Sequence, residues 1–161
     1  MCPDRFVFFV AGEPVGKGRP RVSCVHNRPR VYTPAKTRYY EERVHRAARR
    51  ANIPQIETEL AVDVIAVFKR PKRLLRKKDP DGLLWRPQKP DGDNIRKAVL
   101  DGLSRFFDDK QVVSGDTLNL FGTKECEQGY TVVQIRTKLV EPARVLSKLG
   151  LLTAVGSVPR L

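Results

Sequence analysis

One short stretch of the chain gathers oxygen-bearing side chains of the kind that bind hard metal ions. Its six acidic and amide residues are Asp91, Asp93, Asn94, Asp101, Asp108 and Asp109. Carboxylates that lie close together repel one another, so such a cluster is unfavourable unless a cation lies between them. Mg²⁺ prefers oxygen ligands, and a bound divalent metal makes water nucleophilic near neutral pH. The stretch therefore predicts a metal centre with hydrolytic chemistry.

The spacing within this stretch predicts a helix that presents several of these groups together. Asp93, Lys97 and Asp101 lie at i, i+4 and i+8, positions that share one helix face. Alone, this pattern is better explained by a solvated face with alternating salt bridges. Asp91 just before the helix, and Asp108–Asp109 where the next strand begins, favour carboxylates that meet at one end of a sheet.

Two other polar groups in the stretch have more than one interpretation. Lys97 could neutralise the crowded carboxylates in the metal-free state, or it could contact a phosphate and stabilise charge that develops during phosphoryl transfer. Asn94 could be only a cap or turn residue.

The whole chain is strongly basic, which indicates a polyanionic partner. It carries 31 Lys and Arg against 18 Asp and Glu, a formal net charge of +13 over 161 residues. Nucleic acid is the simplest such partner, although a basic charge can also serve solubility alone. The positive residues cluster, which favours nucleic acid.

The first cluster is a glycine-rich loop over residues 12–21. Glycine lets a backbone approach a ligand closely, and Lys17, Arg19 and Arg21 could bind phosphate. Gly18 follows Lys17 where a Walker A loop has Ser or Thr, so no nucleotide cofactor is expected. A flexible basic turn explains the same composition about equally well.

The second cluster is a long, proline-interrupted connection over residues 69–89. Its cations could follow a phosphate backbone, and those predicted to bind DNA are Arg70, Lys72, Arg73, Arg76, Lys77 and Lys78. Trp85 could stack on bases or wedge between them, but a tryptophan packed against the core is the preferred interpretation.

The elements that must position these groups alternate along the chain. The apolar patterns and turn residues predict a buried strand over 6–10, a hairpin over 22–32, a helix over 34–51, a strand over 60–68, a helix beginning near 93, and strands over 111–124 and 129–139 joined by a tight turn. Thr33 is expected to cap the first helix, and Asp93 or Asn94 the second. The order β-α-β-α-β-β predicts an α+β fold, α/β-like, with a small mixed sheet and two main helices.

The same chain predicts one domain over residues 1–140 and a weakly patterned tail over 141–161, either a short docked helix or loose. Three cysteines without a CxxC pair indicate neither a disulfide framework nor a zinc site, as expected of a cytoplasmic protein. No stretch is long and apolar enough to span a membrane, so no membrane partner is expected.

Several of these segments resemble one known family. KPDGDNIRKAVLDGL over residues 89–103, followed by DDKQVV over 108–113, resembles the signature of the RusA family of Holliday-junction resolvases. GEPVGKGRPR over 12–21 and YTPAKTRYYEE over 32–42 are similar to one branch of that family. The resemblance covers residues 6 to 140, and the tail lies outside it.

The resemblance implies a Mg²⁺-dependent endodeoxyribonuclease, with Mn²⁺ as a possible substitute, that acts as a homodimer. Such enzymes are common in bacteria and their prophages, and they serve DNA recombination and repair. They cut two opposed strands of a four-way junction. By motif position, Asp91, Asp93 and Asp109 match the metal-binding aspartates, Asp108 the adjacent acidic residue and Lys97 the catalytic lysine.

The chain departs from the family pattern at two places. Gly92 stands where the family usually has an apolar residue, and this is expected to loosen the backbone between two ligands. The segment over 101–108 is short, which could change the aim of Asp109. Neither departure removes a catalytic group.

Two other classes of protein compete with a resolvase. A non-catalytic basic DNA-binding protein explains the charge but leaves the carboxylates unexplained. A metal-dependent nuclease for flaps or forks would share every catalytic residue, so the sequence does not separate it from a resolvase.

Overall fold

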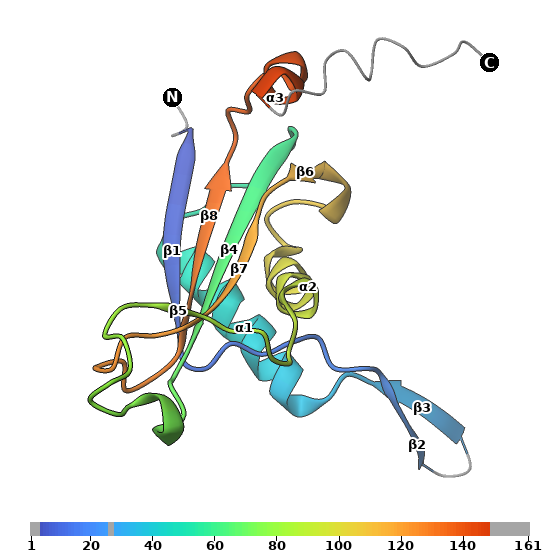
Figure 1. Ribbon diagram of the computed structural model, residues 1–161. Helices are drawn as coiled ribbons and strands as arrows, with labels where there is room; N and C mark the ends of the chain where they lie inside the picture. Colours follow the sequence, from blue (N-terminus) through green and yellow to red (C-terminus); the bar gives the residue numbers. More distant parts are fainter. Residues whose placement is uncertain (1–3, 26–27, 149–161) are drawn as a thin grey trace, which may run out of the picture.

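The computed structural model describes residues 4–25 and 28–148. They form a mixed α+β fold in which two long helices cover one face of a six-stranded sheet, as predicted (Figure 1). The strands are β1 (Arg5–Ala11), β4 (Leu60–Phe68), β5 (Leu84–Trp85), β6 (Val112–Ser114), β7 (Thr117–Phe121) and β8 (Tyr130–Arg136). Their order is β1-β8-β4-β7-β5, with β6 also paired to β4.

Strand β4 is the centre of the sheet. Nearly all of its residues are buried, and it pairs antiparallel with β8 on one side and parallel with β6 and β7 on the other. The predicted strand over 60–68 is therefore confirmed. β1 is only half buried, contrary to prediction, because Phe6, Phe8 and Val10 face the helices while Val7 and Phe9 lie on the open face.

The prediction for the chain after residue 111 is wrong in two respects. One predicted strand is two, because Gly115 has a φ of +133° and breaks the extended run between β6 and β7. A side chain there would collide with the backbone oxygen of Val62. In addition, β7 and β8 are not partners in a hairpin, because β4 lies between them.

Helix α1 (Ala35–Arg50) confirms the helix predicted over 34–51. Its buried residues recur at helical spacing and are Thr37, Tyr40, Val44 and Ala48. The Tyr40 hydroxyl lies 2.7 Å from the Thr131 hydroxyl in a buried hydrogen bond between α1 and β8. The predicted Thr33 cap is wrong: Pro34 occupies the cap position, and no side chain accepts a hydrogen bond from the first turn.

Helix α2 (Gly92–Leu103) packs along α1 at very short range. A Cβ added to Gly102 would lie 2.7 Å from the backbone oxygen of Glu41 and 2.8 Å from Val44 Cβ, so glycine permits this approach. The helix begins after Asp91, which is its N-cap, rather than after Asp93 or Asn94 as predicted.

Three further segments lie outside this two-layer core. Strands β2 (Arg21–Val25) and β3 (Arg28–Tyr32) form the predicted hairpin, a separate two-stranded sheet that projects from the molecule (Figure 1). The connection over 69–91 contains a 3₁₀ turn at Lys72–Leu74 and returns to the edge of the sheet at strand β5, which pairs with β7. Helix α3 (Pro142–Lys148) begins the predicted tail, and residues 149–161 of that tail lie outside the described residues. No helix within the described part of the chain meets the length and apolarity needed to cross a membrane.

Candidate active site

The start of α2 holds the first carboxylates of the site. Asp91 Oδ1 accepts a hydrogen bond from the backbone N–H of Asn94 at 3.3 Å, so this carboxylate caps the helix. Lys97 Nζ donates to Asp93 Oδ2 at 2.7 Å one turn along. The hydrogen bond and charge of Asp93, helped by the charge of Asp91, raise the pKa of Lys97. Lys97 is therefore a protonated ammonium next to two carboxylates.

Arg86 holds the backbone that leads into Asp91. Its side chain is largely buried and donates to the carbonyl oxygens of Gln88 at 2.8 Å, Lys89 at 2.5 Å and Pro90 at 3.3 Å. The guanidinium lies over the Phe68 ring, 3.7 Å from its centroid. The carbonyl groups just before Asp91 are thus tied to the end of the central strand β4.

Gly92 has a packing role that the sequence did not reveal. A Cβ at this position would lie 3.1 Å from Thr117 Cγ2, closer than most Cβ contacts. Glycine therefore lets the first turn of α2 approach β7 closely. The looser backbone expected between Asp91 and Asp93 stays a prediction.

The far end of α2 carries a second charged group. Lys17 Nζ lies 2.8 Å from Glu41 Oε1 and also forms an ion pair with Asp101. Burial by itself lowers the pKa of Lys17, but the hydrogen bonds and charges of the two carboxylates outweigh it and raise that pKa. Lys17 therefore joins the glycine-rich loop to both helices.

Asp109 follows α2 and is close enough to Asp101 to feel its charge. Burial and the negative charges of Asp101 and Asp108 raise the pKa of Asp109, while Lys17 opposes them. Asp108 is different, because hydrogen bonds from the Lys110 backbone and side chain lower its pKa. It caps a 3₁₀ turn over Asp109–Gln111.

The structure thus separates the aspartates of this stretch into two groups along α2. Asp91 and Asp93 lie at its start, whereas Asp101, Asp108 and Asp109 lie at or beyond its end; Asp93 and Asp101 are eight residues apart, about 12 Å at the helical rise. Among the described residues, no three acidic, histidine or cysteine side chains are grouped closely enough to hold a metal ion. The single cup predicted from the sequence is not formed in this arrangement.

The chemistry of these groups nevertheless fits a hard divalent metal. All the predicted ligands are carboxylates, the oxygen donors that Mg²⁺ prefers. The raised pKa of Asp109 reflects burial first and then repulsion from Asp101 and Asp108, and a bound cation would relieve that repulsion. The assignment of Asp91, Asp93, Asp108 and Asp109 as ligands remains a prediction.

The glycine-rich loop lies beside the start of α2. The backbone N–H of Lys17 donates to the carbonyl oxygen of Asn94 at 2.8 Å. A Cβ at Gly16 would lie only 2.6 Å from Pro90 Cβ, so glycine is needed for this approach. The resulting open groove between the loop, α1 and α2 is lined by Arg19 and Arg21 among others, and both of these arginines are exposed.

Arg70 does not belong to the exposed basic surface where it was predicted. It is 3% exposed, and its guanidinium donates to carbonyl oxygens of the connection and of the β7–β8 loop, including Pro80 and Gly122, both at 2.6 Å. Arg70 therefore organises the connection from inside. The remaining predicted cations, Lys72, Arg73, Arg76, Lys77 and Lys78, are exposed.

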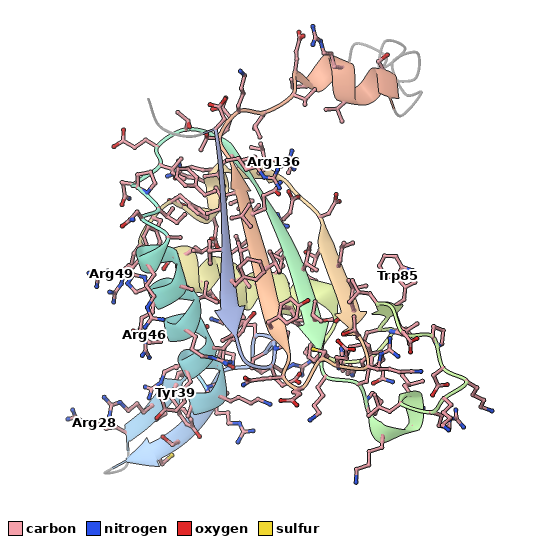
Figure 2. All side chains as sticks on the ribbon, turned by 90° about the vertical axis from the view of Figure 1, so that its left-hand side faces the viewer. Arg28, Tyr39, Arg46, Arg49, Trp85 and Arg136 are labelled. Atoms are coloured by element: carbon pink, nitrogen blue, oxygen red, sulfur yellow. The ribbon has the colours of Figure 1, made fainter. Side chains whose placement is uncertain are left out.

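Trp85 also differs from its preferred interpretation. Its side chain is 72% exposed rather than packed against the core. Figure 2 shows it projecting from the edge strand β5, on the opposite side of the molecule from Arg46 on α1. Leu83 nearby is 53% exposed, so an apolar surface accompanies the basic connection.

Two residues important to the site were missed as such in the sequence. Glu41 pairs with Lys17 across 24 positions, and no local pattern indicates that pairing. Arg86 looked like one more cation of the connection. Its position before the Lys-Pro-Asp run was the only signal, and that signal did not distinguish a buried arginine from an exposed one.

Two comparisons with known proteins gave a match. A family model described as "Endodeoxyribonuclease RusA" matches residues 11–136, which include both carboxylate groups. A protein of Bacillus subtilis (strain 168), named "Uncharacterized protein YqaN", is 36% identical over 118 residues. That alignment covers 68% of this chain and 83% of the relative.

Proposed function

Because this chain belongs to the RusA family of endodeoxyribonucleases, we propose that it resolves four-way (Holliday) DNA junctions by paired nicks in a Mg²⁺-dependent reaction. The observation that carries this proposal is the pair of carboxylate groups at the two ends of α2, set beside exposed arginines in a protein of net charge +13. The basic surface would bind the polyanion, and the carboxylates would serve the cleavage.

The metal would be held by Asp91, Asp93 and Asp109, with Asp108 assisting, and binding would require the two carboxylate groups to come closer together than they are in this structure. When bound, Mg²⁺, or Mn²⁺ in its place, supplies an activated water and stabilises charge on the leaving oxygen. The ammonium of Lys97 can compensate negative charge at the scissile phosphate, because it is held protonated at the start of α2.

Two cations have a supporting role. Arg86 holds the carbonyl groups before Asp91, so it is a positioning residue. Lys17 forms ion pairs with Asp101 and Glu41, so we assign it a role in joining the loop to the helices rather than a contact with DNA.

The DNA would contact the exposed cations around the site. These are Arg19 and Arg21 of the glycine-rich loop with Lys72, Arg73, Arg76, Lys77 and Lys78 of the connection. We leave Arg70 out of this set because it is buried.

We further propose a homodimer, since two-fold symmetry would place two sites on opposed strands. Light scattering would test it, and a monomeric mass at working concentration would contradict it.

The decisive experiment is cleavage of a synthetic four-way junction beside linear duplex and flap DNA, with Mg²⁺ or with EDTA. We expect symmetric paired nicks on the junction alone, lost in EDTA and in the Asp91→Asn and Asp109→Asn variants. Both variants should still bind the junction, because binding rests on the basic surface. Asp4→Asn, an exposed aspartate remote from α2, is the matched control and should cut normally.

Each other outcome would indicate a different function for this protein. Equal cutting of flaps or duplex would indicate a less selective nuclease. Binding without cutting would indicate a non-catalytic DNA-binding protein. Cutting by both aspartate variants would refute the metal-ligand assignment.

A further inference from the structure

The outward face of α1 carries a row of unburied arginines with one tyrosine. Tyr39, Arg46, Arg49 and Arg50 lie at i, i+7, i+10 and i+11, opposite the buried face of the helix. All four are exposed, and Tyr39 is 69% exposed. By the helical rise, Tyr39 and Arg50 are about 16 Å apart along the axis.

Strand β3 of the hairpin extends this row. All five of its residues are exposed, and Arg28 and Arg30 are two positions apart, so they lie on one face of the ribbon. Figure 2 shows Arg28, Tyr39, Arg46 and Arg49 projecting from the same flank of the molecule. We call this surface the basic flank: Arg28, Arg30, Tyr39, Arg46, Arg49 and Arg50.

The cations of the basic flank are poorly neutralised by the protein itself. Within residues 4–25 and 28–148, Arg28, Arg30, Arg49 and Arg50 form no ion pair, and Arg46 pairs only with Glu42 at 3.3 Å. Both side chains of that pair are more than half exposed, so it is weak. Lys17 and Arg70 differ, because their donors are used inside the fold.

We propose that the basic flank binds the phosphate backbone of a duplex DNA arm, away from the carboxylates. The proposal rests on the DNA-cutting function proposed above, and it names a contact surface beyond the loop and connection already assigned. One DNA strand has a phosphate about every 3.4 Å along the helix axis, so a row of about 16 Å spans about five phosphates. The phenol of Tyr39 can donate to a phosphate oxygen.

The composition of the flank favours a duplex over other occupants. A single-strand platform uses several aromatic rings on which successive bases stack, and this row has one on α1. A second copy of the same flank would bring like charges together, which is unfavourable. Phosphate contacts of this kind are independent of sequence, so the surface should bind linear duplex as well as a junction arm.

The test compares two charge-matched variants. Arg46→Gln/Arg49→Gln/Arg50→Gln removes three charges from the flank, and Arg5→Gln/Lys138→Gln/Arg144→Gln removes three exposed charges elsewhere. Fluorescence anisotropy with labelled linear duplex and with a four-way junction, in EDTA, gives the affinity between about 50 and 200 mM salt. Each lost phosphate contact should flatten the plot of log affinity against log salt by about 0.9. For three lost contacts, the fall in affinity from about 50 to 200 mM salt should be about 40-fold smaller for the flank variant than for wild type.

A second variant keeps the test valid if the α1 substitutions disturb folding. Arg28→Gln/Arg30→Gln lies on the hairpin and should flatten the slope by about 1.8. Slopes equal to wild type in both flank variants would overturn the proposal. Equal flattening in the flank and control variants would overturn it as well, because net charge alone would then explain the effect.

The proposed cleavage stands or falls separately. Binding is measured without metal, so the two proposals can fail independently. If the protein never cuts a junction but the flank variants show the flattened slope, the nuclease function is refuted and the DNA-binding flank is supported. If the protein resolves junctions but both flank variants show the wild-type slope, the nuclease function is supported and the DNA-binding flank is refuted.

Discussion

Replacing Arg86 with methionine is expected to damage both the stability of the fold and the geometry of the site. The substitution keeps a long apolar side chain over Phe68 but removes the guanidinium donors to the carbonyl oxygens of Gln88, Lys89 and Pro90. The Asn119 amide still donates to Pro90 at 3.1 Å and to Gln88 at 3.4 Å, so Lys89 loses its side-chain donor and the other two carbonyls lose one of two. Those carbonyls belong to the backbone immediately before Asp91. Held by fewer hydrogen bonds, this backbone would position the carboxylate less accurately.

The magnitude follows from the individual contacts. The two short charge-assisted hydrogen bonds, at 2.8 and 2.5 Å, contribute about 1.5 kcal/mol each, and the contact with the Phe68 ring about 1 kcal/mol. Methionine avoids the desolvation of a charge and recovers part of the apolar contact, which offsets roughly 1 to 2 kcal/mol. The free energy of unfolding should therefore fall by about 2 to 3 kcal/mol.

Urea unfolding at neutral pH measures this loss, and Arg144→Met on the exposed surface of α3 is the matched control, expected to lie within about 0.5 kcal/mol of wild type. Junction cleavage by Arg86→Met should fall at least about tenfold, since displacements near 1 Å are costly in catalysis. Arg86→Lys should not rescue it, because one ammonium does not reproduce a planar fork. Wild-type stability together with wild-type cleavage in Arg86→Met would refute the positioning role.

Three other predictions follow from the packing, the charges and the exposed aromatic residue. Gly102→Ala should lower the free energy of unfolding by about 1 to 2 kcal/mol although alanine favours helices, because its Cβ would lie 2.7 Å from a backbone oxygen of α1. Urea unfolding measures this loss, and Gly82→Ala is the control because a Cβ there would have no atom within 4 Å. Equal effects of the two substitutions would contradict the packing argument. Burial alone would raise the pKa of Asp63, but the N–H of Asp116 and the paired guanidinium hold that pKa below its usual value. The ionised form therefore stabilises the fold above the unfolded pKa of about 3.9, and this stability is lost as pH falls through the lower folded value. Asp63→Asn should flatten the acid limb of the plot of urea midpoint against pH, whereas parallel curves would argue against this. DNA should quench the fluorescence of Trp85, the single tryptophan, and Trp85→Ala should weaken junction binding by about 5- to 100-fold; unchanged emission at saturation would exclude the contact.

Much of the fold was predictable because local patterns decide it. The apolar run of β4 and the helical spacing of α1 are properties of neighbouring residues, and both elements form where they were predicted. The order of the strands was not predictable in the same way. β4 separates β7 from β8 because the most completely buried strand takes the centre, and burial depends on the whole sheet.

The helix start at the site shows the same division. A cap was expected near Asp93, and the structure places it two residues earlier, at Asp91. Capping residues of the same type lie close together here, so their spacing left the choice open. With the cap at Asp91, the first helical residue is Gly92, which lies close to Thr117 of β7. That contact exists only when the sheet is packed, so the local sequence does not indicate it.

The sequence by itself determined the residue types of this protein's chemistry: carboxylates within and on both sides of one helix, a large positive charge and the motifs that place it in its family. Only the tertiary structure decided which cations remain free for a partner. Lys17 and Arg70 look like phosphate ligands in the sequence, yet one faces Glu41 and Asp101 and the other is buried among carbonyl groups. The physical reason is that a cation is neutralised by groups near it in space, and those groups come from positions far away along the chain.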